Sequence, residues 1–222
     1  MDITIAHPEL LNITDEITSQ VFFGGDQGWY AEESARRAGC GPTSAATILA
    51  YLALTRPKLR DLYGAETMSV TAFTRHMEDL YKFVTPRNMG LNRTELFAEG
   101  TAAFASSRGI SLLPHVFGVV SNMVRNRAST DELANFVRAG LASDCPVGFL
   151  NLTRGRVSNL HSWHWITITA AQIGEGSLMA EASDEGQRMH FDLRLWYLST
   201  RLRGGLVYFT HDDKGRNGSH AQ

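Results

Sequence analysis

One stretch decides the fold: Ala38-Gly39-Cys40-Gly41-Pro42-Thr43-Ser44-Ala45-Ala46-Thr47-Ile48-Leu49. It places a single cysteine between two glycines at the start of a predicted helix. A thiol there lies at the positive end of the helix dipole and beside unpaired backbone N–H groups, which favour the nucleophilic thiolate. Pro42 suits the first helical turn, and the two glycines let backbone approach the sulfur. We therefore predict that Cys40 is a nucleophile.

The residues after this cysteine continue with helical spacing. Apolar positions recur at i, i+3, i+4, i+7 and i+8, which indicates one buried helix face; they are Ala45, Ile48, Leu49, Leu52 and Ala53. An inert core cysteine at the start of this helix is the alternative, because free cysteine is among the most buried residue types. Whether Cys40 is a nucleophile or an inert core residue depends on whether the chain also supplies a base for it.

The composition predicts a single globular domain over residues 1–222. Of these residues 43% are hydrophobic and 20% charged, and the formal net charge is −2. No block of basic residues favours nucleic acid or an anionic membrane as a partner, and neither a signal peptide nor a transmembrane segment is recognisable. We expect a cytoplasmic location, no metal and no cofactor. Cys40 and Cys145 are too few for a disulfide framework.

The order of predicted elements is α+β, with a helical part over 1–145 and a sheet part over 146–211. Helices are expected from Cys40, from near Ser69, from Asn92-Arg93-Thr94-Glu95 to near Gly109, and from Ser129-Thr130-Asp131-Glu132; residues 110–124 are strand-like or irregular. Strands are expected at 147–152, 163–170, 178–182 and 206–209, with a turn at 174–177. Residues 212–222 are expected to form a disordered tail.

A nucleophilic cysteine needs a base, and the base needs a group that orients it. His164 opens a predicted strand, so we assign it as the base, with His161 in the preceding loop as the alternative. Counting back from the turn at 174–177 brings Asp184 opposite residues near 167, close enough to orient His164; a bulge would be needed to align them. The alternative for Asp184 is that it merely starts a turn with Glu185-Gly186.

An oxyanion donor completes the predicted site. Gln27 lies upstream of the nucleophile in a glycine-rich segment, so its amide is our candidate beside the backbone N–H of Cys40. We assign substrate contacts to Trp29, Gly39, Trp163 and Trp165. For the three tryptophans the alternative is packing between layers, because aromatic residues dominate cores.

Taken in order, these motifs resemble the papain-like cysteine peptidases. The segment Gly39-Cys40-Gly41-Pro42 is similar to the helix start of the bacterial C39-like branch. The resemblance implies a helix bearing the nucleophile, packed on an antiparallel sheet. It also implies Cys40 as nucleophile, His164 as base, Asp184 as orienting acid and Gln27 as oxyanion donor. Gln27 lies thirteen residues before Cys40, a longer gap than is usual in the family.

The function expected from this reading is hydrolysis of a peptide or amide bond through a Cys40 acyl-enzyme. Two alternatives remain open from the residues. An acyl-transferring relative (a cell-wall peptide amidase, a transpeptidase or a transglutaminase) would use the same acyl-enzyme, and a catalytically silent binding module would use the fold alone. The oligomeric state is unknown, and so is the role of the insert between Cys40 and Pro146.

Overall fold

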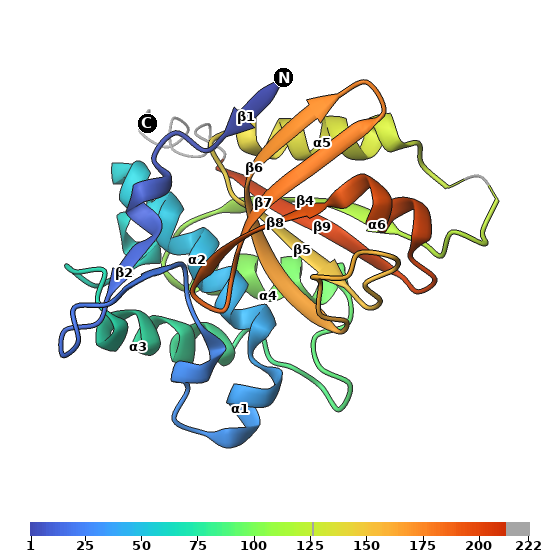
Figure 1. The fold of residues 1–222 in the computed structure, drawn as a ribbon. Helices are drawn as coiled ribbons and strands as arrows, with labels where there is room; N and C mark the ends of the chain where they lie inside the picture. Colours follow the sequence, from blue (N-terminus) through green and yellow to red (C-terminus); the bar gives the residue numbers. More distant parts are fainter. Residues whose placement is uncertain (126, 212–222) are drawn as a thin grey trace, which may run out of the picture.

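Helices and an antiparallel sheet make up an α+β fold in the computed structural model, which describes residues 1–125 and 127–211 (Figure 1). The helices are α1 (Glu33–Ala38), α2 (Cys40–Thr55), α3 (Val70–Tyr81), α4 (Thr94–Ser107), α5 (Thr130–Ala142) and α6 (Leu193–Ser199). The strands are β1 (Asp2–Thr4), β2 (Asn12–Thr14), β3 (Val21–Phe23), β4 (Leu112–Val119), β5 (Val147–Asn151), β6 (His164–Gly174), β7 (Ser177–Asp184), β8 (Gln187–Asp192) and β9 (Gly204–His211).

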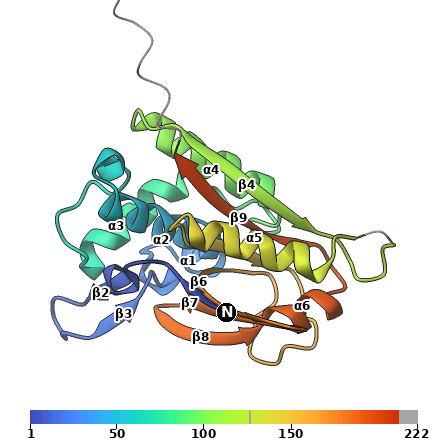
Figure 2. The same cartoon turned by 90° about the horizontal axis from the view of Figure 1, so that it is seen from above.

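Strand β6 lies at the centre of the sheet. The strand order is β4-β9-β5-β6-β7-β8, and β1 pairs with the far half of β6. Every pairing in this sheet is antiparallel, whereas β2 and β3 form a separate pair. Helix α5 lies beside β1 in both ribbon views (Figure 2). Within the described residues, no helix is long and apolar enough to cross a membrane.

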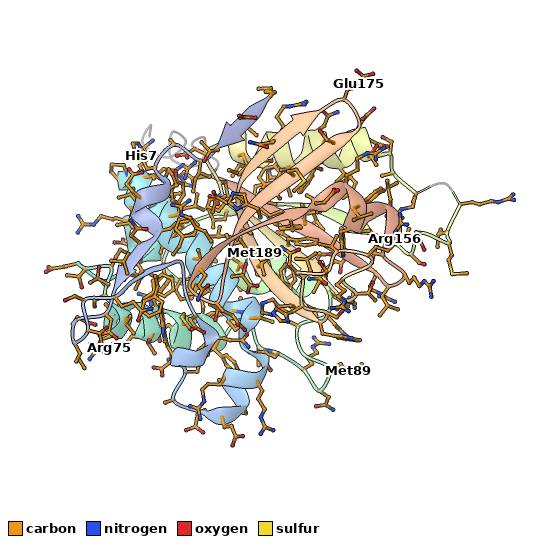
Figure 3. All side chains as sticks on the ribbon, viewed as in Figure 1. His7, Arg75, Met89, Arg156, Glu175 and Met189 are labelled. Atoms are coloured by element: carbon orange, nitrogen blue, oxygen red, sulfur yellow. The ribbon has the colours of Figure 1, made fainter. Side chains whose placement is uncertain are left out.

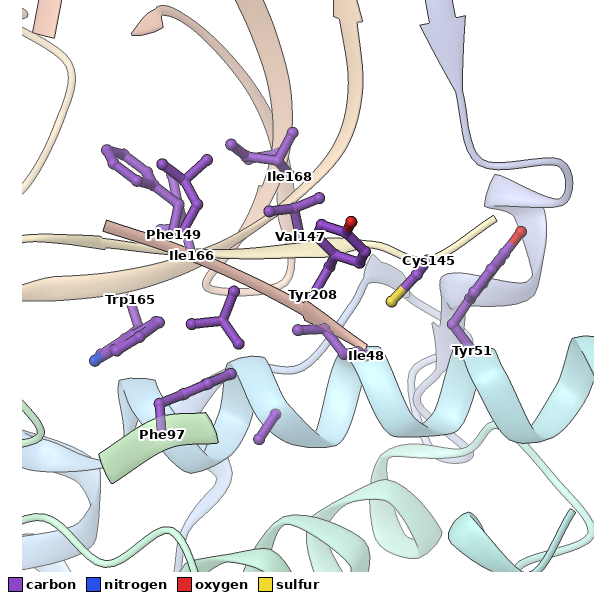
Figure 4. Packing of buried hydrophobic residues seen from close by; sticks show 14 of the residues in the cluster. Ile48, Tyr51, Phe97, Cys145, Val147, Phe149, Trp165, Ile166, Ile168 and Tyr208 are labelled. Carbon is purple, nitrogen blue, oxygen red and sulfur yellow. The ribbon is translucent and has the colours of Figure 1, made fainter. Parts of the chain in front are cut away.

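Helix α2 packs between the sheet and α3 and is buried along most of its length. Residues 41–53 are all buried, including the predicted apolar face. Figure 4 shows Phe97 of α4 next to Trp165 of the sheet, and Ile48 of α2 pointing toward Val147 and Tyr208. The Phe97 and Trp165 rings stack with their centroids 4.1 Å apart. On the other face of the sheet, Phe149 meets Trp196 of α6 edge to face.

Several predicted boundaries agree with the structure. Helix α3 begins after Ser69, whose side chain accepts a hydrogen bond from the backbone N–H of Ala72. Helix α5 begins with a capping box between Ser129 and Glu132. Helix α4 also begins in the predicted segment, but its N-cap is Arg93, and no side chain caps it.

The predicted helical part over 1–145 is wrong in one respect, because it also contains β1, β2 and β3. Strand β4 falls within residues 110–124, which the sequence predicts to be strand-like or irregular. Strand β1 pairs with β6, β2 pairs with β3, and β4 pairs with β9 along its whole length. Strands β1 to β3 have three residues each, too few for a period-2 pattern to show, so tertiary pairing decides them. The tail predicted at 212–222 lies outside the described residues.

Replacing Phe97 tests the contact between the helices and the sheet. Phe97 is fully buried against Trp165, so Phe97→Ala leaves a cavity and should lower the free energy of unfolding by about 3–5 kcal/mol. Denaturant unfolding followed by tryptophan fluorescence measures this. Leu54→Ala, at a position 41% exposed, is the control and should change stability by less than about 0.5 kcal/mol. Equal losses in both variants would contradict this packing.

Candidate active site

Cys40 is the first residue of α2 and is partly exposed, whereas the residues that follow it are buried. Gly39 joins α1 directly to α2 and lies against the ring of Tyr30. A Cβ on Gly39 would lie 2.4 Å from that ring and 2.5 Å from the Ala35 carbonyl oxygen, so only glycine fits here. This tight junction places the thiol at the helix N-terminus, as predicted from the sequence.

His164 and Asp184 form a hydrogen-bonded pair at the ends of two neighbouring strands. His164 Nε2 lies 2.6 Å from Asp184 Oδ1, and both side chains are almost buried, at 10% and 13% exposure. The side chain of Cys40 also interacts with the His164 ring, whose Nε2 is taken by Asp184. Nδ1 is therefore the ring nitrogen left to face Cys40, which lines the same pocket.

A bulge in β6 puts these two residues on one face of the sheet. The register between β6 and β7 shifts by one residue between Ile168 and Ala170, so that Thr167 lies opposite Ser183. One step further, Asp184 lies beside Ile166, two residues from His164. Side chains two apart share a face of a strand, so the histidine and the carboxylate meet. Without the bulge, Asp184 would oppose Thr167 and point to the other face.

The turn after Asp184 holds its carboxylate in place. Glu185 and Gly186 both have positive φ, +46° and +74°, and Asp184 pairs with Gln187 across them, as in a two-residue type I′ hairpin. Asp184 therefore starts a turn and also bonds His164. The two readings of this residue are compatible.

The segment that carries Gln27 is tied to the same turn. The backbone N–H of Phe23 donates to the Gly186 carbonyl, and that of Gly186 donates to the Gly25 carbonyl. A Cβ on Gly24 would lie 2.1 Å from Ser183 Oγ, so glycine is needed for this close approach. Gln27 follows in a single 3₁₀ turn (Gln27–Trp29).

One small cavity of about 20 Å³, enough for a water-sized group, joins the predicted residues. Cys40, His164, Asp184 and Gln27 all line it. Gln27 Oε1 is buried and has no hydrogen-bond partner within the described residues. The side-chain amide of Gln27 thus lies at the pocket, and its carbonyl oxygen accepts no hydrogen bond from a described residue.

The surroundings of His164 favour its charged form. Burial alone would lower the pKa of His164, but interactions with the Asp184 carboxylate and the Cys40 side chain raise it from 6.5 to about 10. The imidazole is therefore held as imidazolium next to the thiol. By contrast, burial raises the pKa of Cys145 to about 12, and its thiol donates to the Pro146 carbonyl in the core. Cys145 is therefore an inert core thiol.

The other predicted residues lie in different surroundings. The ring of His161 is exposed, its centroid 6.1 Å from that of His164, and it does not line the cavity. Trp29 packs edge to face on Phe22 and Phe73, and Trp165 is 3% exposed beneath the pocket. These two tryptophans pack between layers. Trp163 is 45% exposed and has a positive φ of +60° directly before His164.

Sequence reasoning missed a layer of hydroxyl groups under the pocket. Ser44 Oγ lies 2.8 Å from Thr167 Oγ1, and Ser183 Oγ donates to the Phe23 carbonyl oxygen. These groups are buried and partnered, so they fix α2 on β6 and β3 on β7. Serine and threonine in a helix or strand give no signal of such partners, because the pairing arises only in the folded chain.

His164, Asp184 and Glu185 offer a metal ion three ligand atoms within 4.8 Å of one another. His164 and Asp184 are already hydrogen-bonded to each other through Nε2 and Oδ1. Glu185 is exposed at the turn and adds one carboxylate. This group supports no metal site by itself.

Comparisons with known proteins add little. No protein-family model and no curated protein matches the chain. The crystal structure of the Pseudomonas avirulence protein AvrPphB is similar over 82% of this chain and 96% of that one, at 12% identity and a TM-score of 0.35. A likeness this distant carries no argument about fold or function.

The pKa of His164 predicts how the pair responds to pH. Because the folded-state pKa lies above the ordinary value of 6.5, the imidazolium stabilises the folded chain in full below about pH 6.5. This contribution is lost as the pH rises through about 10. An NMR titration of the His164 ring should show a midpoint near 10, and Asp184→Asn should lower it. A midpoint near 6.5 in the unmodified protein would contradict the pairing.

Proposed function

We propose that the protein is a papain-like thiol hydrolase that cleaves a peptide or amide bond. The observation that supports this most is the short His164–Asp184 hydrogen bond in a pocket shared with Cys40 at the start of α2. Nucleophile, base and orienting carboxylate then occur together, with each on a rigid element. The helix start Gly39-Cys40-Gly41-Pro42 supports the bacterial C39-like branch.

In the proposed reaction the Cys40 thiolate attacks the carbonyl carbon of the scissile bond. The tetrahedral oxyanion accepts hydrogen bonds from the Cys40 backbone N–H and the Gln27 amide. His164 donates its proton to the leaving amine, the C–N bond breaks, and an acyl-enzyme remains on Cys40. His164 then takes a proton from water, which attacks the thioester and releases the carboxylic acid. Asp184 holds the imidazole ring in orientation throughout.

Alkylation with iodoacetamide near pH 6 tests the thiolate–imidazolium pair. A free thiol with a pKa of about 8.5 is only about 0.3% ionised there, so a paired Cys40 should react at least about tenfold faster than Cys40 in His164→Ala. Mass spectrometry assigns the site, and buried Cys145 should stay unlabelled. His161→Ala is the matched control and should label at the unmodified rate. Slow labelling of Cys40 in the unmodified protein would leave the silent binding module as the better reading.

The proposed role of Gln27 is tested with p-nitrophenyl acetate, a small activated ester. Gln27→Ala should slow its hydrolysis by about 10²-fold, because one oxyanion donor is lost. The same variant should alkylate with iodoacetamide at the unmodified rate, since that displacement forms no oxyanion. Gln20→Ala, at an exposed position away from the pocket, is the control. Unchanged ester hydrolysis in Gln27→Ala would remove Gln27 from the site.

A further inference from the structure

Positive charge gathers at one end of the molecule although the chain as a whole is slightly acidic. The segments 121–128, 153–163 and 193–204 contain seven arginines and no Asp or Glu, whereas the whole chain has 21 basic and 23 acidic residues. Described residues of the first two segments each hydrogen-bond to the third. The backbone N–H of Asn122 donates to the Thr200 carbonyl, and that of Arg156 donates to Ser199 Oγ. Figure 3 labels Arg156 at this end, near α6.

This arginine-rich end contains a groove, which we define by the residues of its cavity of about 600 Å³. It is lined by Asn92, Arg93, Thr94, Glu95, Gly118–Ser121, Leu150 and Arg201–Gly204. A second cavity of about 500 Å³, lined by Arg154, Arg156 and Arg201 among others, adjoins it. Arg201 lines both cavities, so the two lie next to each other.

The sheet links the groove to the candidate active site. His164 pairs with Asn151, Asn151 with Gly204, and Gly204 with Val119, in one row across β6, β5, β9 and β4. Neighbouring strands lie about 4.8 Å apart, so the groove at Gly204 begins roughly 10 Å from His164. An extended peptide rises about 3.3 Å per residue, and this separation therefore corresponds to about three residues.

Two arginines of the groove form no ion pair with a described acidic residue. Arg201 and Arg203 are exposed, and within the described residues neither makes an ion pair. The Nε atom of Arg93 lies 3.5 Å from Oε2 of Glu95, and an exposed ion pair of this kind contributes little binding energy. A guanidinium binds a carboxylate through two parallel hydrogen bonds, so the groove suits carboxylate side chains.

We propose that this groove selects peptide substrates with an acidic side chain about three residues from the scissile bond, held by Arg201 and Arg203. The proposal rests on the thiol-hydrolase function above and names its substrate class. Acidic residues further along the substrate would reach Arg154 and Arg156 in the adjoining cavity.

The shape and lining of the groove favour a peptide over the other polyanions. The residues that line it include no aromatic side chain on which a base would stack. It is also a cavity, lined by the buried Val119 and Leu150, whereas a lipid surface needs a protruding face. The groove is therefore expected to bind a peptide, and the test below includes a nucleic acid and a membrane as competing ligands.

Binding to Cys40→Ala, which lacks the nucleophile, measures the groove independently of catalysis. Two fluorescent peptides of about ten residues are compared by anisotropy at about 0.15 M salt, one built from Glu, Gly and Ser and its twin with Gln for Glu. The acidic peptide should bind at least about tenfold more tightly. Arg201→Gln and Arg203→Gln should each weaken it several-fold. Arg60→Gln carries the same charge change at an exposed site outside the groove and should leave binding unchanged.

The acidic peptide should also slow iodoacetamide alkylation of Cys40 in the unmodified protein, because it would cover the pocket. Equal binding of the two peptides, equal weakening by Arg60→Gln, or binding without protection of Cys40 would overturn the proposal. So would tighter, Arg201-dependent binding of a single-stranded oligonucleotide or of phosphatidylserine vesicles. Slow alkylation of the peptide-free protein would instead count against the hydrolase function, and it is read separately from the anisotropy.

Discussion

The contact between the start of α2 and strand β6 is the constraint on which the candidate site depends. Cys40 and His164 belong to different layers, so their separation is set by how closely the helix lies on the sheet. Two buried hydroxyls, Ser44 and Thr167, meet at this interface only four and three residues from the proposed nucleophile and base. A buried hydroxyl left without its partner costs about 1–3 kcal/mol, so this bond resists sliding of α2 along β6. The stacked rings of Phe97 and Trp165 fill the same interface.

A second constraint is the one-residue bulge in β6, and it marks where sequence reasoning stopped. The turn at 174–177 and both of its strands follow from alternation and glycine positions, so the proximity of Asp184 to His164 was predictable. The face of the sheet was not. A single extra residue moves every following side chain to the other face of the sheet. The segment Ile168-Thr169-Ala170 contains no glycine or other residue typical of a bulge, so the sequence does not predict one there.

The helices show the same division between local and tertiary information. Helices α3 and α5 begin where a serine caps the backbone, and capping is a local interaction that sequence records. The strands β1, β2 and β3 have three residues each, too few for an alternating pattern in the sequence. They exist because β1 pairs with β6 and β2 pairs with β3. The position of Gln27 at the pocket depends on β3, which leads into the Gln27 turn. The residues that line the pocket were therefore predictable, whereas the strand pairings and the bulge that bring them together were not.

Charge is a further case in which linear and spatial patterns differ. The absence of a basic block in the sequence argued against anionic partners, and the net charge of −2 agreed. Folding nevertheless brings together three acid-free segments from separate parts of the chain, because the ends of β4, β5 and β9 meet at one edge of the sheet. Net charge governs solubility and long-range attraction, but the field inside a groove is set by the few groups that line it. The charged groups that line this groove are Arg93, Arg201 and Arg203 against one acid, Glu95. Strand β9, which leads out of the groove at Gly204, is separated from β6 by β5 alone, so an anionic substrate would find the positive field and the proposed base at the same end of the sheet.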